Sequence, residues 1–389
     1  MKKLWLLVTV VTLFSCSKSE LSVMNTPSET IVLKGDITTS KTLTSNNVYV
    51  LDGNVYVKNC SQLTIEPGTV IKSSNRGMLI IEQCSKIIAN GTSNKPIVFT
   101  SGKPSGQKSP GDFGGIVILG YAKTNNNNAV FDLQCIGAPY GGNNDNDNSG
   151  ILRYVRIEYG GFPLPAQFDM GALTLGGVGK GTTIEYVQTS YSGDCSFYFM
   201  GGSVNTSNLY SYASADDDFS FNYGYNGTVK NSVSKKDKMY CHQPVLGEQF
   251  NNGNGVECKN NGSTTIPTYP KLDNMILILD SSTLRIGSGL YTEGVSKFEL
   301  TNSTITEWNH LGVLLSSNSY QSYMNNSSKL TNNKFNSGYD PLLCYQTNEL
   351  KKKAQSEGNI ESYITKNQIE ILSKPTWTNN WTNFPTKGN

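Results

Sequence analysis

The sequence predicts an all-β protein, a right-handed parallel β-helix with inserted loops, from three observations. The stretch that begins at Gly53 recurs from Gly77, at an offset of 24 residues. SGDCSFYF and ASADDDFSF share an offset of 22 residues, which places Asp194 over Asp216. Charged residues make up only 16% of the 389-residue chain, which has 38 Gly and 21 Tyr. Such a composition is typical of short strands joined by many turns.

Stacked coils place like residues of successive units at equal sequence offsets. Each unit of 22 to 30 residues has short alternating strands, a polar corner and a Gly turn, and buries its apolar side only against its neighbours. LTNSTITEW recurs as LTNNKFNSG after 30 residues, which stacks Asn302 on Asn332 at a turn. Leucine-rich repeats lack support because the regular Leu pattern is missing, and propeller blades need about 40 residues. A jelly roll gives no reason for equal offsets.

One β-helix domain is expected over residues 31–389. Long polar loops interrupt it near residues 121–150 and 235–272. NELKKKAQSEGN, from Asn348, is the best helix candidate, and we expect it to cap the C-terminal end of the solenoid.

The N-terminus is predicted to be a processing signal. Residues 1–16 have a basic start, an apolar run and the sequence LFSC, which resembles a bacterial lipobox in which Cys16 is lipidated. Residues 17–30 would then be a flexible tether. We expect an outer-membrane lipoprotein, with the membrane face left open; the alternative is an ordinary signal peptide with an incidental Cys.

The other cysteines permit disulfides in an envelope protein. Cys60 over Cys84 predicts a ladder of like side chains inside the tube, Cys241 and Cys258 are candidates for a bridge, and most of the others are expected as free buried thiols. The chain has no CxxC pair, which disfavours zinc. A net charge of +2 gives no indication of a nucleic-acid partner.

Two acidic clusters are candidate calcium sites. In the first, Asp194 would lie about 4.8 Å from the position one coil later, in the run Asp216, Asp217 and Asp218. Carboxylates that close repel unless a cation or a shared proton intervenes, and calcium prefers such oxygen ligands. The alternative is that these side chains cap solvated turns.

The second cluster is DNDNSG, in which Asp145 and Asp147 match the opening of a calcium loop. Arg156 stands where the closing Glu is needed, which excludes a full EF-hand. A partial calcium loop and a flexible Asn-rich loop both remain open.

Tyrosines gather in one region and are candidates for a ligand-binding strip. Outward rings on adjacent coils would stack on sugars or peptides. The alternative is a ladder that only stabilises the coils. The candidates are Tyr191, Tyr198, Tyr210, Tyr212, Tyr223 and Tyr225.

Several long motifs resemble one family. LTIEPGTVIK, SPGDFGGIVILG, NDNDNSGILRYVRIEYGG and WTNNWTNF are similar to those of Bacteroidota envelope lipoproteins with a right-handed parallel β-helix. The resemblance implies fold and compartment but no activity. Relatives tend to have the sequence SGDDSFEFFGG where this chain has Cys195 and Tyr198. The acidic cluster of this chain therefore has fewer acidic residues.

Three functions are considered. The first is a non-catalytic surface lipoprotein whose rigid solenoid binds a glycan, a peptide or an outer-membrane protein. The second is a calcium-dependent polysaccharide lyase or hydrolase, with catalytic Asp194, Asp216 and Asp217 and with Lys230 or Arg285 as the basic partner. The third is an accessory subunit of an outer-membrane assembly. The chain has only two His residues, which gives little support to a nucleophilic triad.

Overall fold

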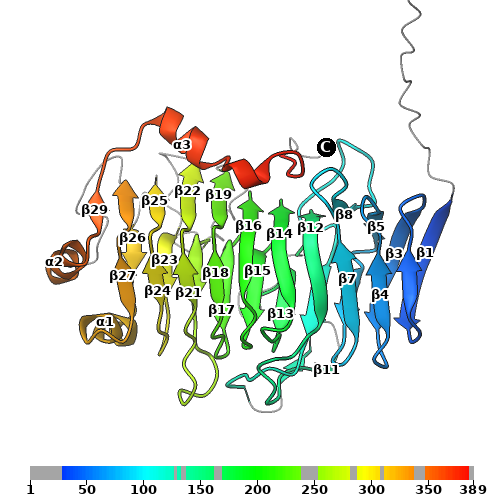
Figure 1. Cartoon of the computed structure of the whole chain (residues 1–389), viewed down its shortest axis with the longest axis horizontal. Coiled ribbons are helices and arrows are strands. Elements are labelled where there is room, and N and C mark those ends of the chain that lie inside the picture. The colour runs from blue at the N-terminus through cyan, green and yellow to red at the C-terminus, as the bar shows by residue number, and fades with distance from the viewer. Residues whose placement is uncertain are drawn as a thin grey trace, which may run out of the picture.

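The chain winds as a right-handed parallel β-helix, as predicted (Figure 1). The computed structural model describes residues 29–126, 129–132, 137–161, 169–237, 253–280, 287–306, 311–336 and 347–384. Its strands lie side by side from β1 at one end to β29 at the other. Among the described strands every pairing is parallel except that of β10 (Val130–Phe131) with β11 (Ala138–Pro139).

Each coil contributes to three stacked faces, here named A, B and C. Face A holds β2 (Lys41–Leu43), β4 (Gln62–Ile65), β7 (Lys86–Asn90), the first parts of β12 (Gly150–Glu158), β14 (Thr183–Ser190) and β16 (Thr206–Tyr212), then β18 (Thr228–Lys230), β21 (Lys271–Asp273), β24 (Glu299–Thr301) and β27 (Lys329–Thr331). Face B holds the first parts of β1 (Thr30–Ile37) and β3 (Val48–Val57), then β5 (Val70–Ser74), β8 (Ile97–Ser101), the second parts of β12, β14 and β16, β19 (Val233–Asp237), β22 (Ile276–Asp280), β25 (Thr304–Thr306), β28 (Lys334–Asn336) and β29 (Ile360–Glu361). Face C holds the second parts of β1 and β3, then β6 (Met78–Ile81), β9 (Gly115–Leu119), β13 (Gly171–Gly176), β15 (Cys195–Met200), β17 (Phe219–Asn222), β20 (Val256–Cys258), β23 (Ser288–Thr292) and β26 (Leu311–Leu314).

A single left-handed residue turns the chain from face A to face B. Most residues disfavour this conformation, whereas Asn tolerates it. Asn274 and its stacked neighbour Asn231 are joined by a side-chain hydrogen bond of 2.8 Å. The predicted stack of Asn302 and Asn332 is confirmed. The corner residues have φ between 50° and 56° and are Tyr154, Tyr186, Asn208, Asn231, Asn274, Asn302 and Asn332.

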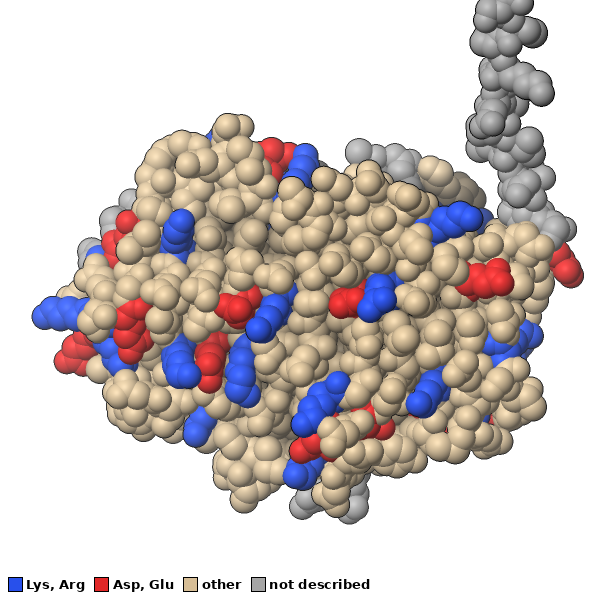
Figure 2. Space-filling view, viewed as in Figure 1, with Lys and Arg blue, Asp and Glu red and all other residues tan. Residues whose placement is uncertain are grey.

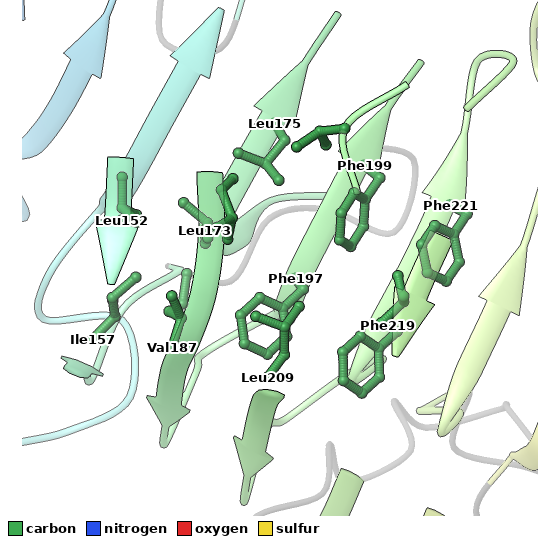
Figure 3. Packing of buried hydrophobic residues seen from close by; sticks show 14 of the residues in the cluster. Leu152, Ile157, Leu173, Leu175, Val187, Phe197, Phe199, Leu209, Phe219 and Phe221 are labelled. Carbon is green, nitrogen blue, oxygen red and sulfur yellow. The ribbon is translucent and has the colours of Figure 1, made fainter. Parts of the chain in front are cut away.

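The repeat offsets correspond to the observed register. Phe197 pairs with Phe219, and the two rings stack with their centroids 5.2 Å apart. Phe199 lies over Phe221 at 4.8 Å in the same way, and all four rings point into the tube (Figure 3). Stacked aromatic pairs contribute about 0.5–1.5 kcal/mol beyond their burial, so like side chains in register stabilise the coils.

Helices close the C-terminal end of the solenoid. The predicted helix is confirmed as α2 (Asn348–Ser356), which inserts Leu350 and Ala354 into the core. The other helices are α1 (Ser317–Met324), α3 (Lys366–Leu372) and the 3₁₀ turn η3 (Thr376–Thr378). Within the described part of the chain, no helix has the length and apolar character needed to cross a membrane.

Residues 366–384 form a C-terminal strap that runs back over face B (Figure 1). The buried Trp381 ring meets Tyr154 edge-on at 5.7 Å and Tyr186 at 6.3 Å. The Arg156 guanidinium donates to the Trp381 carbonyl at 3.3 Å. The strap therefore ties the last residues to coils in the middle of the solenoid.

The cysteines require two corrections. Cys60 and Cys84 do stack, at a Cα–Cα distance of 4.6 Å, but they are exposed at a corner and form a disulfide rather than a ladder inside the tube. Their positive φ turns both side chains outward, and neighbouring coils are within disulfide reach. Cys258 is a free buried thiol, which contradicts the expected bridge to Cys241. Cys16 and Cys241 lie outside the described residues.

Charged side chains are interspersed on the surface. Figure 2 shows Lys and Arg next to Asp and Glu over the face in view, without a large patch of one sign. Exposed ion pairs such as Lys34 with Asp52, at 3.0 Å, contribute little to stability.

Candidate functional site

The register of face C brings Asp194 and Asp216 together. Asp194 precedes β15 and Asp216 lies three residues before β17, and the pairing of Phe197 with Phe219 sets the two aspartates opposite each other. The Asp216 amide faces the Asp194 carbonyl at 3.5 Å. The sequence-predicted juxtaposition is therefore present in the structure.

A third carboxylate and a thiol join them. Ligand atoms of Asp169, Cys195 and Asp216 lie within 4.8 Å of one another, the one such group of three among the described residues. Asp194 is nearly buried, and its Oδ1 accepts the Cys195 amide at 2.8 Å. We name Asp169, Asp194, Asp216, Asp217 and Glu257 the acidic ladder.

Burial sets the protonation of this ladder. Burial, then the charges of Asp216 and Asp169, raises the pKa of Asp194 well above its usual value. Burial and Asp217 raise the pKa of Asp216 to about 7, although Lys236 opposes the shift. Two buried carboxylates this close do not both ionise readily.

Asp217 and Glu257 form a second carboxyl pair. Burial raises the pKa of Asp217 well above its usual value, and the carboxylate of Glu257 raises it further by hydrogen bonding to the protonated form. The Asp217 Oδ1 accepts the Asn254 amide at 2.7 Å and its side-chain Nδ2 at 2.9 Å. Lys259 Nζ donates to Glu257 Oε2 at 2.8 Å. Burial and the neighbouring Glu257 thus favour the protonated form of Asp217, and the Lys259 ammonium group stands beside Glu257.

Asp218 differs from its neighbours. Its carboxylate accepts hydrogen bonds from the hydroxyls of Ser211, Ser214 and Ser234, and Lys236 Nζ lies 3.7 Å away. Both charged side chains are fully buried. Because its oxygens already have these donors, Asp218 is a structural ion-pair partner, and the structure does not present it with Asp194 and Asp216 as a metal ligand.

Asp145 and Asp147 are not brought together as ligands either. Asp145 accepts the Lys123 amide at 3.2 Å and pairs with its ammonium at 3.4 Å. Asp147 is buried and accepts the Ser149 hydroxyl at 3.0 Å. The carboxylates thus have separate partners, and the calcium loop stays a prediction.

Lys230, the basic partner expected from the sequence, does not lie near the acidic ladder. Lys230 is exposed on β18 and lines a shallow groove with Glu185 on face A, whereas the acidic ladder lies on face C. Lys236 and Lys259 contact the ladder instead. Arg285 lies outside the described residues.

The predicted exposed tyrosine strip is wrong. Tyr191, Tyr198, Tyr210 and Tyr225 are each at most 4% exposed. Tyr191 stacks on Tyr159 at a corner, and the Tyr225 hydroxyl donates to the Val204 carbonyl at 2.8 Å.

The strap covers another part of this strip. Phe384 packs on Tyr210 and Tyr212, at centroid distances of 5.1 and 5.2 Å. The Tyr210 hydroxyl donates to the Ser373 carbonyl at 2.8 Å. The sequence pattern of strands alone does not reveal this covering segment.

Two of the predicted tyrosines line a pocket of about 200 Å³ on face C. The loop that carries β10 and β11 forms one wall, and β15 and β17 lead into the other. We name this cavity the face C pocket. Its lining residues are Asn126, Val130, Phe131, Asp132, Tyr140, Asp169, Tyr198, Met200, Tyr223 and Asn261.

Sequence reasoning missed Asp169, Glu257 and Lys259. FDMGALTLGG and GDCSFYFMGG align in sequence at an offset of 25 residues, whereas β13 pairs with β15 at an offset of 24. Asp169 therefore lies opposite Gly193, next to Asp194, and the sequence alignment points to the correct coil but not to the correct register. Glu257 and Lys259 follow a long insertion that hides their register.

A family model described as a pectate-lyase-like beta helix domain matches residues 35–382. The chain belongs to this family. No curated protein and no solved structure matches it. The predicted parallel β-helix family is thus supported, and the lipid anchor and the Bacteroidota origin stay predictions.

The acidic ladder of this pectate-lyase-like β-helix fits calcium only in part. Asp169 and Asp216 offer two of the oxygen ligands that calcium prefers, but it takes about six to eight of them. Cys195 offers a thiol, which suits softer metals. Lys259 Nζ already lies 3.4 Å from Asp169 Oδ2. No chemical step is therefore assigned to a cation here.

Proposed function

We propose that the protein is a non-catalytic outer-membrane lipoprotein that binds a glycan in the face C pocket. The observation that carries the proposal is the lining, in which the rings of Tyr140, Tyr198 and Tyr223 meet the side-chain amides of Asn126 and Asn261. Aromatic rings cover the apolar face of a sugar, and a few placed polar groups fix its hydroxyls. Carboxylates in the same wall add further acceptors.

Attachment to the membrane is part of this proposal. Lipidated Cys16 would hold the chain, and residues 17–30 would separate the β-helix from the bilayer. The Cys60–Cys84 disulfide supports export, because disulfides persist in oxidising compartments. Labelling of cells with radioactive palmitate tests the anchor: we expect label in the outer-membrane fraction and its loss in Cys16→Ser. Equal labelling of the variant would refute it.

A glycan array tests binding. We expect the detergent-solubilised protein to bind a subset of glycans and Tyr198→Phe to bind them more weakly. Tyr363→Phe is the matched control, because Tyr363 is 81% exposed and lies outside the pocket. An array with no bound glycan, or equal binding by both variants, would contradict the proposal.

A calcium-dependent polysaccharide lyase or hydrolase is the second candidate. Asp216 favours it, because a carboxyl group whose pKa burial and Asp217 raise to about 7 suits general acid–base catalysis at neutral pH. Lys259 would be the basic partner in place of Lys230. Incubation with uronate polymers and calcium, monitored for unsaturated or shortened products, tests it.

Product that disappears in Asp216→Asn would establish the enzyme and overturn the non-catalytic role. Titration calorimetry with calcium tests the ion separately. A binding heat that Asp216→Asn abolishes would support a calcium site, and no heat would remove it.

A further inference from the structure

We propose that the face C pocket selects a sugar residue that carries a protonated amine, an inference that rests on the proposed glycan-binding function. The ligand class is an amino sugar with a free ammonium group, in preference to its N-acetylated form and to uronates. Three properties of the pocket support this choice: the charge of its wall, its aromatic hydroxyls and its size.

The charge of the wall is negative. Asp132 and Asp169 line the pocket, and among the described residues no Lys or Arg does. Lys259 lies beside Asp169 at 3.4 Å, but it is also held at 2.8 Å by Glu257, so one ammonium group serves two carboxylates. A cleft of one sign raises the local concentration of oppositely charged ligands.

Neighbouring sequence does not offset this charge. Residues 127–128, 133–136 and 162–168, which adjoin lining residues along the chain, contain no charged side chain. A uronate carboxylate would therefore meet like charge, whereas an ammonium group would meet Asp132 and Asp169.

The aromatic side of the pocket provides a second attraction. Tyr198 is 4% exposed, and within the described residues its hydroxyl has no hydrogen-bond partner although the residue lines the cavity. A ligand hydroxyl or N–H in the cavity would hydrogen-bond to it. Rings of Tyr140 and Tyr223 complete an aromatic wall of the kind that attracts ammonium groups.

Asp169 lines the same cavity as Tyr198 and Tyr223. Burial, and after it the charge of Asp169, raises the pKa of both Tyr198 and Tyr223. The two rings thus share the electrostatic environment of Asp169. A ligand ammonium in this space would contact ring and carboxylate together.

Size limits the ligand to one residue. The cavity holds about 200 Å³, below the roughly 300–1,000 Å³ of sites for drug-sized molecules. A single sugar ring is therefore the unit of recognition, and a longer glycan would extend beyond the pocket.

Ligand-observed NMR titration of the full-length protein tests the selection. The probes are glucosamine, N-acetylglucosamine, glucose and glucuronic acid, at a pH where the amine is protonated. We expect glucosamine to bind at least about tenfold more tightly than the other three. Asp132→Asn should weaken glucosamine binding about tenfold and leave glucose little changed, whereas Tyr198→Phe should weaken the binding of both sugars.

The variants have matched controls. Asp36→Asn and Tyr363→Phe carry the same chemical changes at exposed positions outside the pocket and should bind as the wild type does. Asp132 is itself exposed, and Tyr198→Phe removes one oxygen, so circular dichroism should show both folded.

The outcomes separate the two proposals. Equal or tighter binding of N-acetylglucosamine or glucuronic acid, still lost in Tyr198→Phe, would overturn the amine selection and leave the glycan-binding function standing. Glucosamine binding that both pocket variants retain would also overturn the selection. If none of the four sugars binds in the NMR titration and no glycan on the array is bound, the proposed function itself would be overturned.

Discussion

The pH dependence of stability tests the acidic ladder, and Asp216→Asn isolates it. Burial and Asp217 raise the pKa of Asp216 from its ordinary value of 3.8 to about 7. Between these values the folded protein binds a proton that the unfolded chain releases. The contribution of protonated Asp216 to the free energy of unfolding is therefore complete below about pH 4. It is lost as the pH rises through about 7. Each pKa unit is worth about 1.4 kcal/mol, so the whole difference is about 4 kcal/mol.

An amide has nearly the shape of a protonated carboxyl and cannot ionise. Relative to the wild type, Asp216→Asn should therefore become more stable by about 3 kcal/mol between about pH 5 and pH 8, measured by urea unfolding in EDTA. Asp36→Asn is the control, because the Asp36 side chain is 50% exposed; its difference from the wild type should stay within about 0.5 kcal/mol throughout. A difference for Asp216→Asn that does not change with pH would show that this carboxyl is not desolvated, and the reasoning would fail.

Three further predictions concern stability. Asp218→Asn should destabilise the protein by about 3–5 kcal/mol in urea unfolding, because it leaves the buried Lys236 ammonium without its counter-ion; a neutral effect would contradict the ion pair. Trp381→Ala should cost about 3–5 kcal/mol and expose the C-terminal strap to limited proteolysis; an unchanged cleavage pattern would show that the ring does not hold it. Reduction of Cys60–Cys84, which closes a separation of 24 residues, should lower stability by about 3 kcal/mol and speed hydrogen exchange in β3 to β6; unchanged exchange would refute a role for this bond in holding the first coils.

The sequence was sufficient where like residues stack and insufficient where distant segments cover a surface. Offsets of 22, 24 and 30 residues predicted the pairing of Phe197 with Phe219 and of Asn302 with Asn332, because register is a local property of a solenoid. The burial of Tyr210 depends on Phe384, which lies far along the chain and follows no repeat. No period in the strands encodes that contact.

The acidic positions show the same division. The juxtaposition of Asp194 with Asp216 followed from the offset. The different roles of Asp217 and Asp218 did not, since they depend on which way each side chain leaves a corner and on donors such as Lys236. The sequence therefore located the cluster but could not assign its members.

Polar groups inside this solenoid are mostly paired, and the acidic ladder is the departure that directs attention to function. Buried Asp218 has three hydroxyl donors and an ammonium group. Asp194 is almost as buried, yet within the described residues its carboxylate receives the amide and the side chain of Cys195 and no ammonium group, and it faces Asp216. The fold thus gives Asp218 a full set of hydrogen-bond donors but places Asp194 opposite another carboxyl group. This arrangement is destabilising, and it lies beside a pocket. Such arrangements concentrate at functional sites, which is why we place ligand binding on face C.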